Sequence, residues 1–146
     1  MMKILLDNNA IDEIANNIDF IKAHKEISFY ICREVAEEVS RKNDTYNPLT
    51  NIISLFKIAP TYLPNAVFVL GHSLLDGESQ FCDENTALVY DNILKETKSN
   101  ISDAIIAATA VSNGCTLLTY DDELYKKMKK YGYSVITFEE LRDLVK

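Results

Sequence analysis

The sequence is poor in cysteine and histidine, and this shortage removes two classes of site. Its cysteines, Cys32, Cys82 and Cys115, are odd in number, widely separated and without a CxxC pair. That pattern is typical of reduced, mostly buried thiols in a cytosolic protein, and it argues against disulfides or a zinc knuckle. The two histidines, His24 and His72, lack the H-x-x-x-H spacing of a zinc site, so we expect no metal ligation from them.

Glycine-rich motifs and long apolar runs are also missing. Only four glycines are present, and neither G-x-G-x-x-G nor G-x-x-x-x-G-K-[ST] occurs, so dinucleotide-binding and P-loop sites have no support. No run approaches the roughly 20 apolar residues that a membrane-spanning helix needs. The start, MMKILLD, has neither the basic region nor the apolar core of a secretion signal. We therefore expect a cytoplasmic protein that does not enter a membrane.

Positive charge is scarce as well. The chain has 15 Lys and Arg residues against 22 Asp and Glu residues, which gives a formal net charge of −7. This balance argues against a protein that holds nucleic acid through a broad basic surface. The length of 146 residues, with 47% hydrophobic and 25% charged residues, predicts one globular domain over residues 1–146.

Short apolar runs alternate with amphipathic ones along the chain. The apolar runs are brief and rich in β-branched or aromatic residues, as in parallel strands buried on both faces. They are Lys3–Leu6, Ile27–Ile31, Ala66–Leu70, Thr116–Thr119 and Ser134–Phe138. The helix-like segments are Ala10–Ile18, Arg33–Lys42, Pro48–Ile58, Asn85–Lys98, Asp103–Asn113, Asp122–Tyr131 and Glu139–Val145. This order predicts an α/β fold with a parallel sheet of about five strands between two helical layers.

An aspartate follows two of the predicted strands: Asp7 comes directly after Lys3–Leu6, and Asp121 comes after Thr116–Thr119 and Tyr120. In parallel α/β sheets, ligands bind beyond the carboxyl ends of the strands. Each aspartate could equally cap the helix that follows, which contributes about 0.5–2 kcal/mol. We expect Asp122, which lies past the strand end, to be the cap or an ion partner. Taken singly, the other two aspartates leave capping and function open.

Asp103 opens the Ala-rich helix and lies on its small-residue face, beside Ala107 and Ala110. On the wheel this face is well away from the polar positions Thr109, Ser112 and Asn113. A first-turn acid is favoured by the helix dipole, by about 0.3–1 kcal/mol. However, a carboxylate on a packed face needs donors or a cation, because burying it unpaired is costly. We therefore favour a functional role for Asp103.

Three glutamates, Glu34, Glu37 and Glu38, follow the second predicted strand. The apolar stripe of the expected helix consists of Cys32, Val35, Ala36 and Val39. Glu34 and Glu37 lie almost opposite that stripe, whereas Glu38 flanks it. Glu38 is therefore the glutamate that we expect to face an interior site. A solvated position on a charged helix is the alternative.

The four candidate acids, Asp7, Glu38, Asp103 and Asp121, come from separate segments at or near the carboxyl edge of the sheet. Clustered carboxylates repel one another unless a cation lies between them. Oxygen ligands select Mg²⁺ or Mn²⁺, and such ions activate water and stabilise the charge that develops on a phosphodiester. The set predicts a metal-dependent nuclease or phosphatase. A phosphatase with an aspartate nucleophile is disfavoured, because its Asp-x-Asp motif is absent here.

Three motifs resemble those of the PIN-domain family of metal-dependent ribonucleases, particularly the toxin-type members called VapC. KILLDNNAID is similar to the family's hydrophobic strand followed by Asp-x-Asn. ICREVAEEV resembles the segment that carries the second acid. SDAIIAATAVSNGCTLLTYDDEL is similar to the family's Asp-rooted, Ala-rich helix, Gly turn and strand ending in Thr-x-Asp. The resemblance covers both ends of the chain and little of the middle.

The resemblance implies a three-layer α/β/α sandwich in which the strands before Asp7 and Asp121 are neighbours. It implies metal binding and catalysis by Asp7, Glu38, Asp103 and Asp121, with Asn9 and Thr119 as supporting residues. The implied activity is Mg²⁺- or Mn²⁺-dependent endoribonuclease cleavage that leaves a 3′-hydroxyl and a 5′-phosphate. It also implies a homodimer and an antitoxin that blocks the site. A PIN-type nuclease of RNA processing or decay, and an inactive PIN-like protein-binding module, are the alternatives.

A run of lysines begins about a turn after Asp121 and comprises Lys126, Lys127, Lys129 and Lys130. One interpretation is a solvated helix face with cations near the helix C-terminus. The other is a local patch in which Lys126 and Lys127 contact RNA phosphates on an otherwise acidic protein.

Overall fold

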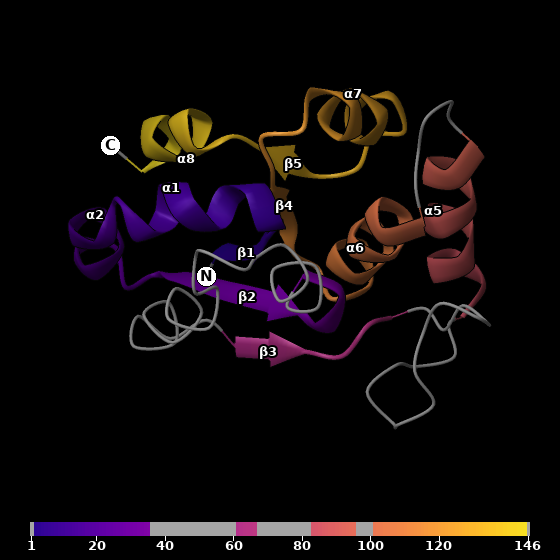
Figure 1. Cartoon of the computed structure of the whole chain (residues 1–146), viewed down its shortest axis with the longest axis horizontal. Coiled ribbons are helices and arrows are strands. Elements are labelled where there is room, and N and C mark those ends of the chain that lie inside the picture. Colours follow the sequence, from indigo (N-terminus) through magenta and orange to yellow (C-terminus); the bar gives the residue numbers. More distant parts are fainter. Residues whose placement is uncertain (1, 36–60, 67–82, 96–100, 146) are drawn as a thin grey trace, which may run out of the picture.

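A five-stranded parallel sheet organises the protein (Figure 1). The structure is a computed structural model that describes residues 2–35, 61–66, 83–95 and 101–145. The strand order is β3-β2-β1-β4-β5, and every pairing is parallel. The strands are β1 (Met2–Leu6), β2 (Ile27–Cys32), β3 (Thr61–Leu63), β4 (Thr116–Leu118) and β5 (Val135–Ile136). The predicted α/β class, the parallel sheet and the β1–β4 neighbourhood are thus confirmed.

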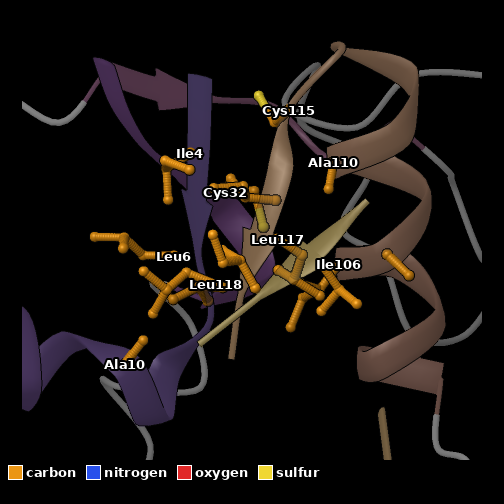
Figure 2. Packing of buried hydrophobic residues seen from close by; sticks show 14 of the residues in the cluster. Ile4, Leu6, Ala10, Cys32, Ile106, Ala110, Cys115, Leu117 and Leu118 are labelled. Atoms are coloured by element: carbon orange, nitrogen blue, oxygen red, sulfur yellow. The ribbon is translucent and has the colours of Figure 1, made fainter. Parts of the chain in front are cut away.

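Helices cover both faces of the sheet. They are η1 (Asn8–Ala10), α1 (Ile11–Ala15), α2 (Ile18–Ala23), α5 (Glu84–Lys95), α6 (Ile101–Ser112), α7 (Asp122–Lys130) and α8 (Phe138–Leu144). Figure 2 shows Ile4 and Leu6 on the side of the sheet that faces Ala10, and Leu117 on the side that faces Ile106 of α6. These side chains are fully buried, so the sheet is the apolar middle layer of three. Among the described helices, none has the length and apolar content to cross a membrane.

Helix α6 is the most deeply packed helix of the described chain, because it lies between the sheet and α5. Every residue of the range 104–110 is buried. Thr109, expected on a polar side of this helix, is buried too, which corrects the helical-wheel assignment. Its hydroxyl donates to the carbonyl of Ile105 (2.8 Å) and accepts from the N–H of Ala66 (3.0 Å). The helix is followed by Gly114 at φ 67°, a left-handed turn that favours glycine and matches the predicted Gly turn.

Two predicted strands differ from the structure. The third strand is Thr61–Leu63, and Ala66, the predicted start of a strand over 66–70, forms a bend, while the remainder lies outside the described residues. The last strand ends at Ile136 because Thr137 caps α8. The Thr137 hydroxyl accepts from the N–H of Glu140, whose carboxylate accepts from the N–H of Thr137. This capping box converts the end of an apolar run into a helix start.

Some predicted helices differ from the structure or extend beyond the residues that it describes. The expected helix Ala10–Ile18 is interrupted by a turn at residues 16–17, after which α2 begins at Ile18. The helix expected from Arg33 does begin there and is described only through Val35. The predicted helix Pro48–Ile58 lies outside the described residues.

Replacing Leu117 by alanine tests the three-layer core. Leu117 is fully buried on the α6 side of the sheet, so Leu117→Ala should lower the free energy of unfolding by about 2–5 kcal/mol. Urea denaturation followed by circular dichroism measures the change. The matched control is Leu88→Ala, because Leu88 is 55% exposed on α5 and its truncation should cost less than about 0.5 kcal/mol. Equal losses in the two variants would contradict the core described above.

Candidate active site

Asp7 stands at the end of β1, where the neighbouring strand β4 also ends. It is only 3% exposed. Its backbone N–H donates to the carbonyl of Leu118 (3.0 Å), which continues the β1–β4 pairing by one residue. Its carboxylate accepts from the N–H of Asn8 at Oδ1 (2.8 Å) and from the Thr119 hydroxyl at Oδ2 (2.7 Å). One donor therefore comes from each strand end, and together they fix the orientation of the carboxylate.

Thr119 links Asp7 to the segment that carries Asp121. The Thr119 hydroxyl donates to Asp7 and accepts from the backbone N–H of Asp121 (3.1 Å). Asn9 reaches the same segment, since its Oδ1 accepts from the backbone N–H of Tyr120 (3.0 Å). The two ends of the chain are thus joined by a small hydrogen-bonded network at the carboxyl edge of the sheet.

Asp121 is the N-cap of α7. Its Oδ1 accepts from the backbone N–H groups of Glu123 (3.0 Å) and Leu124 (3.2 Å), and the residue is half-buried. Of the two roles expected for Asp122, cap or ion partner, the capping role is therefore wrong, because Asp122 is the exposed first residue of the helix. Capping of this kind engages one carboxylate oxygen, whereas an ionised carboxylate has two. A cap and a metal ligand can accordingly be the same residue.

Asp103 lies in the first turn of α6 and is half-buried. The preceding residue, Ser102, donates its hydroxyl to Oε1 of Glu34 (2.5 Å). Because Glu34 lies two residues after the end of β2, this bond brings the start of α6 to the same edge of the sheet as Asp7.

Glu34 is buried, with an exposed fraction of 1%, although its wheel position predicted solvent. The wheel counted Cys32 as helical, but Cys32 ends β2, and the helical turn starts at Arg33. The backbone N–H of Glu34 donates to Oδ1 of Asn65 (2.9 Å), which is itself buried. Sequence reasoning thus missed Glu34, and only its position two residues after a strand hinted at burial. The preferred second acid, Glu38, lies outside the described residues, as does Glu37.

The Cys32 thiol lies near two of these carboxylates. Its pKa is raised to about 12, chiefly by burial, and the negative charges of Glu34 and Asp7 raise it further. Both carboxylates therefore lie within electrostatic reach of one buried sulfur atom at the ends of β1 and β2. A thiol held in this protonated state is an inert structural group. Cys32 and Cys115 are both free and buried, as expected for reduced cysteines.

The described acids offer oxygen ligands, the type that Mg²⁺ and Mn²⁺ prefer. Asp7, Asp103 and Asp121 all lie at the carboxyl edge of the sheet. Within the described ranges, no three His, Cys, Asp or Glu side chains stand close enough together to hold a metal ion. The donor chemistry fits a hard divalent cation, and the four-acid set additionally requires Glu38.

The lysine run divides between solvent and core. Lys126, Lys129 and Lys130 are exposed, which fits a solvated face, whereas Lys127 is 7% exposed on the side of α7 that packs inward. Lys129 and Lys130 place their Nζ atoms 5.5 Å from the ring centroids of Tyr125 and Tyr131. Of the two lysines predicted to contact RNA, Lys126 is thus the one that faces solvent.

Comparisons with known proteins agree with this arrangement. The family model that matches, described as PIN domain, covers residues 4–131. No curated protein matches. A domain of a functionally unknown protein from Methanocaldococcus jannaschii is similar over 94% of this chain and 91% of its own, with a TM-score of 0.60 and 18% identity.

Two further solved structures have the same fold. PAE2754 from Pyrobaculum aerophilum matches over 96% of this chain and 93% of its own, with a TM-score of 0.56 and 21% identity. DNA-bound VapBC from Salmonella typhimurium matches over 94% and 98%, with a TM-score of 0.56 and 17% identity. A parallel α/β/α sandwich with carboxylates at its carboxyl edge is a fold that suits a hydrolytic site. The chain belongs to the PIN domain family, a family of nucleases.

Removing the Thr119 hydroxyl tests the network around Asp7. Thr119→Val leaves a buried carboxylate oxygen and the Asp121 N–H without their partner, so the free energy of unfolding should fall by about 1–3 kcal/mol. Thr119→Ser retains the hydroxyl and should recover most of this loss. The control is Thr116→Val, since Thr116 is only half-buried and its hydroxyl bond to Ser134 is exposed. Denaturant unfolding of the wild type and the three variants measures the free energy of unfolding. If Thr119→Val and Thr116→Val lower it by the same amount, the contact of Thr119 with Asp7 contributes no more than an exposed hydrogen bond.

Proposed function

We propose that the protein is an endoribonuclease that requires Mg²⁺ or Mn²⁺ and hydrolyses RNA phosphodiester bonds. The observation that carries the proposal is the buried Asp7 carboxylate, oriented by Thr119 at the joint end of two parallel strands. A buried carboxylate costs free energy unless hydrogen bonds or a cation compensate, and the carboxyl ends of parallel strands are where ligands bind in such sheets. Membership of the PIN domain family supports a nuclease at this edge.

Asp7, Glu38, Asp103 and Asp121 are the residues that would hold the metal. When bound, a divalent ion supplies positive charge that stabilises the charge developing on the scissile phosphate. The chain's own contribution is orientation. Thr119 and the Asn8 N–H hold both oxygens of Asp7, and Asn9 fixes the backbone that leads to Asp121. These hydrogen bonds fix the orientation of the Asp7 carboxylate before any ligand binds.

We further propose that the nuclease is the toxin of a toxin–antitoxin pair. The support is the similarity in fold to VapBC structures from Salmonella typhimurium and Haemophilus influenzae. In this proposal the protein forms a homodimer, and an antitoxin protein covers the acidic edge of the sheet. A small DNA-binding protein encoded next to this chain should co-purify with it and abolish RNA cleavage. Stable purification of an active enzyme with no such neighbour would instead favour a role in RNA processing or decay.

Replacing Asp103 by asparagine tests the nuclease. Purified protein incubated with structured RNA should cleave it in Mn²⁺ and not in EDTA. Asp103→Asn removes one negative ligand, so the cleavage rate should fall by about 100-fold or more. The control is Asp19→Asn, an exposed acid on α2, which should cleave as wild type. Cleavage that persists in EDTA, or an Asp103→Asn variant as active as wild type, would disprove this site.

Replacing Lys126 by glutamine tests phosphate binding by α7. If Lys126 contacts one RNA phosphate, Lys126→Gln should weaken RNA binding and reduce the slope of log affinity against log salt concentration by about one. The matched control, Lys22→Gln, removes an exposed lysine from α2. Titration of labelled RNA at several salt concentrations, with a non-cleaving variant, measures both slopes. Identical slopes for the two variants would assign Lys126 to the solvated helix face.

A further inference from the structure

Glu34 is a buried acid that the proposed metal set does not use. Burying a carboxylate costs free energy unless hydrogen bonds or charges compensate. Its Oε2 atom is enclosed along with the rest of the side chain. The chain nevertheless places this residue at the first helical turn after β2, next to the candidate site. Its contacts indicate what it does there.

These contacts join the end of β2 to the start of α6. The Glu34 carboxylate accepts from the hydroxyl of Ser102, 68 residues away in sequence. The Glu34 backbone N–H donates to Asn65, and the next residue, Ala66, donates its N–H to the Thr109 hydroxyl. Helix α6 is therefore hydrogen-bonded at two points, Ser102 and Thr109, to the segments that follow β2 and β3, and the two points are two turns apart. Ser102 immediately precedes Asp103.

The first turn of a helix is held loosely by the helix's own hydrogen bonds, because its first N–H groups have no partner within the helix. The Ser102 bond does not involve those N–H groups; it is an additional side-chain contact at the same turn. A charged acceptor makes a hydrogen bond roughly twice as strong as a neutral one. The bond from Ser102 to the Glu34 carboxylate is of this kind. It holds the backbone that bears Asp103 against the carboxyl end of β2.

We propose that Glu34 is a positioning residue, which acts through Ser102 to fix the Asp103 carboxylate relative to Asp7. Glu34 itself touches neither substrate nor metal in this role. The proposal rests on the proposed function, because it concerns the geometry of the same acidic edge. A merely structural role for Glu34 would lower the stability of its variants and leave the affinity of the folded protein for Mn²⁺ unchanged.

The test compares Mn²⁺ binding by calorimetry at a temperature where circular dichroism shows each variant to be folded. Ser102→Ala removes the donor, and Glu34→Gln removes the charge while it keeps the volume. Residues that support metal ligands from outside typically affect metal affinity by 10–100-fold. We therefore expect the Kd for Mn²⁺ to rise about tenfold in Ser102→Ala and by a smaller factor in Glu34→Gln. The double variant should resemble Ser102→Ala alone, because both changes break one contact.

Two controls make the result specific. Ser102→Thr keeps the hydroxyl and should bind Mn²⁺ within about twofold of wild type. Ser112→Ala makes the same chemical change at the exposed far end of α6 and should have no effect. In RNA cleavage at saturating Mn²⁺, Ser102→Ala should lower kcat and leave KM for RNA unchanged, since the substrate does not contact Ser102.

The outcomes separate the two proposals. If wild type binds Mn²⁺, Asp103→Asn weakens it, and both Ser102→Ala and Glu34→Gln bind as wild type, the positioning role is overturned while the metal site stands. If wild type binds no Mn²⁺, the proposed function fails and the positioning role fails with it. Should Ser102→Ala not fold, the comparison of Glu34→Gln with wild type decides, because that change preserves the packed volume.

Discussion

The parallel pairing of β1 with β4 is the constraint on which the candidate site depends. Because both strands run the same way in register, Leu6 opposite Leu118, the residues that follow them meet at one edge. Asp7 and Thr119 thereby come within hydrogen-bond distance although 112 residues separate them in sequence. Apolar layers on both faces hold the two strands together, and they also exclude the water that would otherwise compete for the bond.

Helix α6 extends the same edge. Its small, apolar residues let it lie between the sheet and α5, so its axis is set by packing on two sides. Packing alone does not fix where the first turn lies along the helix axis relative to the edge of the sheet. Two polar contacts also hold the helix: Ser102 donates to Glu34, which follows β2, and Thr109 accepts from the N–H of Ala66, so both partners come from parts of the chain far from α6 in sequence. Helix α6, which bears Asp103, is thus held at this edge by packing on two sides and by these polar bonds.

The aspartates at the strand ends serve the local fold whatever else they do. Asp7 caps η1, and Asp121 caps α7, each through one carboxylate oxygen. The capping and ligand interpretations of these residues were alternatives in the sequence, yet they are compatible in the structure. Capping fixes each carboxylate relative to the start of a helix, so the orientations of Asp7 and Asp121 are coupled to the local fold.

The sequence by itself determined the alternation of strands and helices, the parallel sheet and the strand-end positions of Asp7 and Asp121. The strands and helices are predicted by local hydrophobic periodicity, and the two aspartates are recognised because they come soon after apolar runs. Both signals extend over only a few residues. Only the tertiary structure decided that Glu34 and Thr109 are buried, that β3 is Thr61–Leu63 and that Lys127 faces inward. A helical wheel shows which residues share a face, but distant segments determine what covers that face. Burial of a polar residue is therefore a property of the packed chain and not of its local pattern.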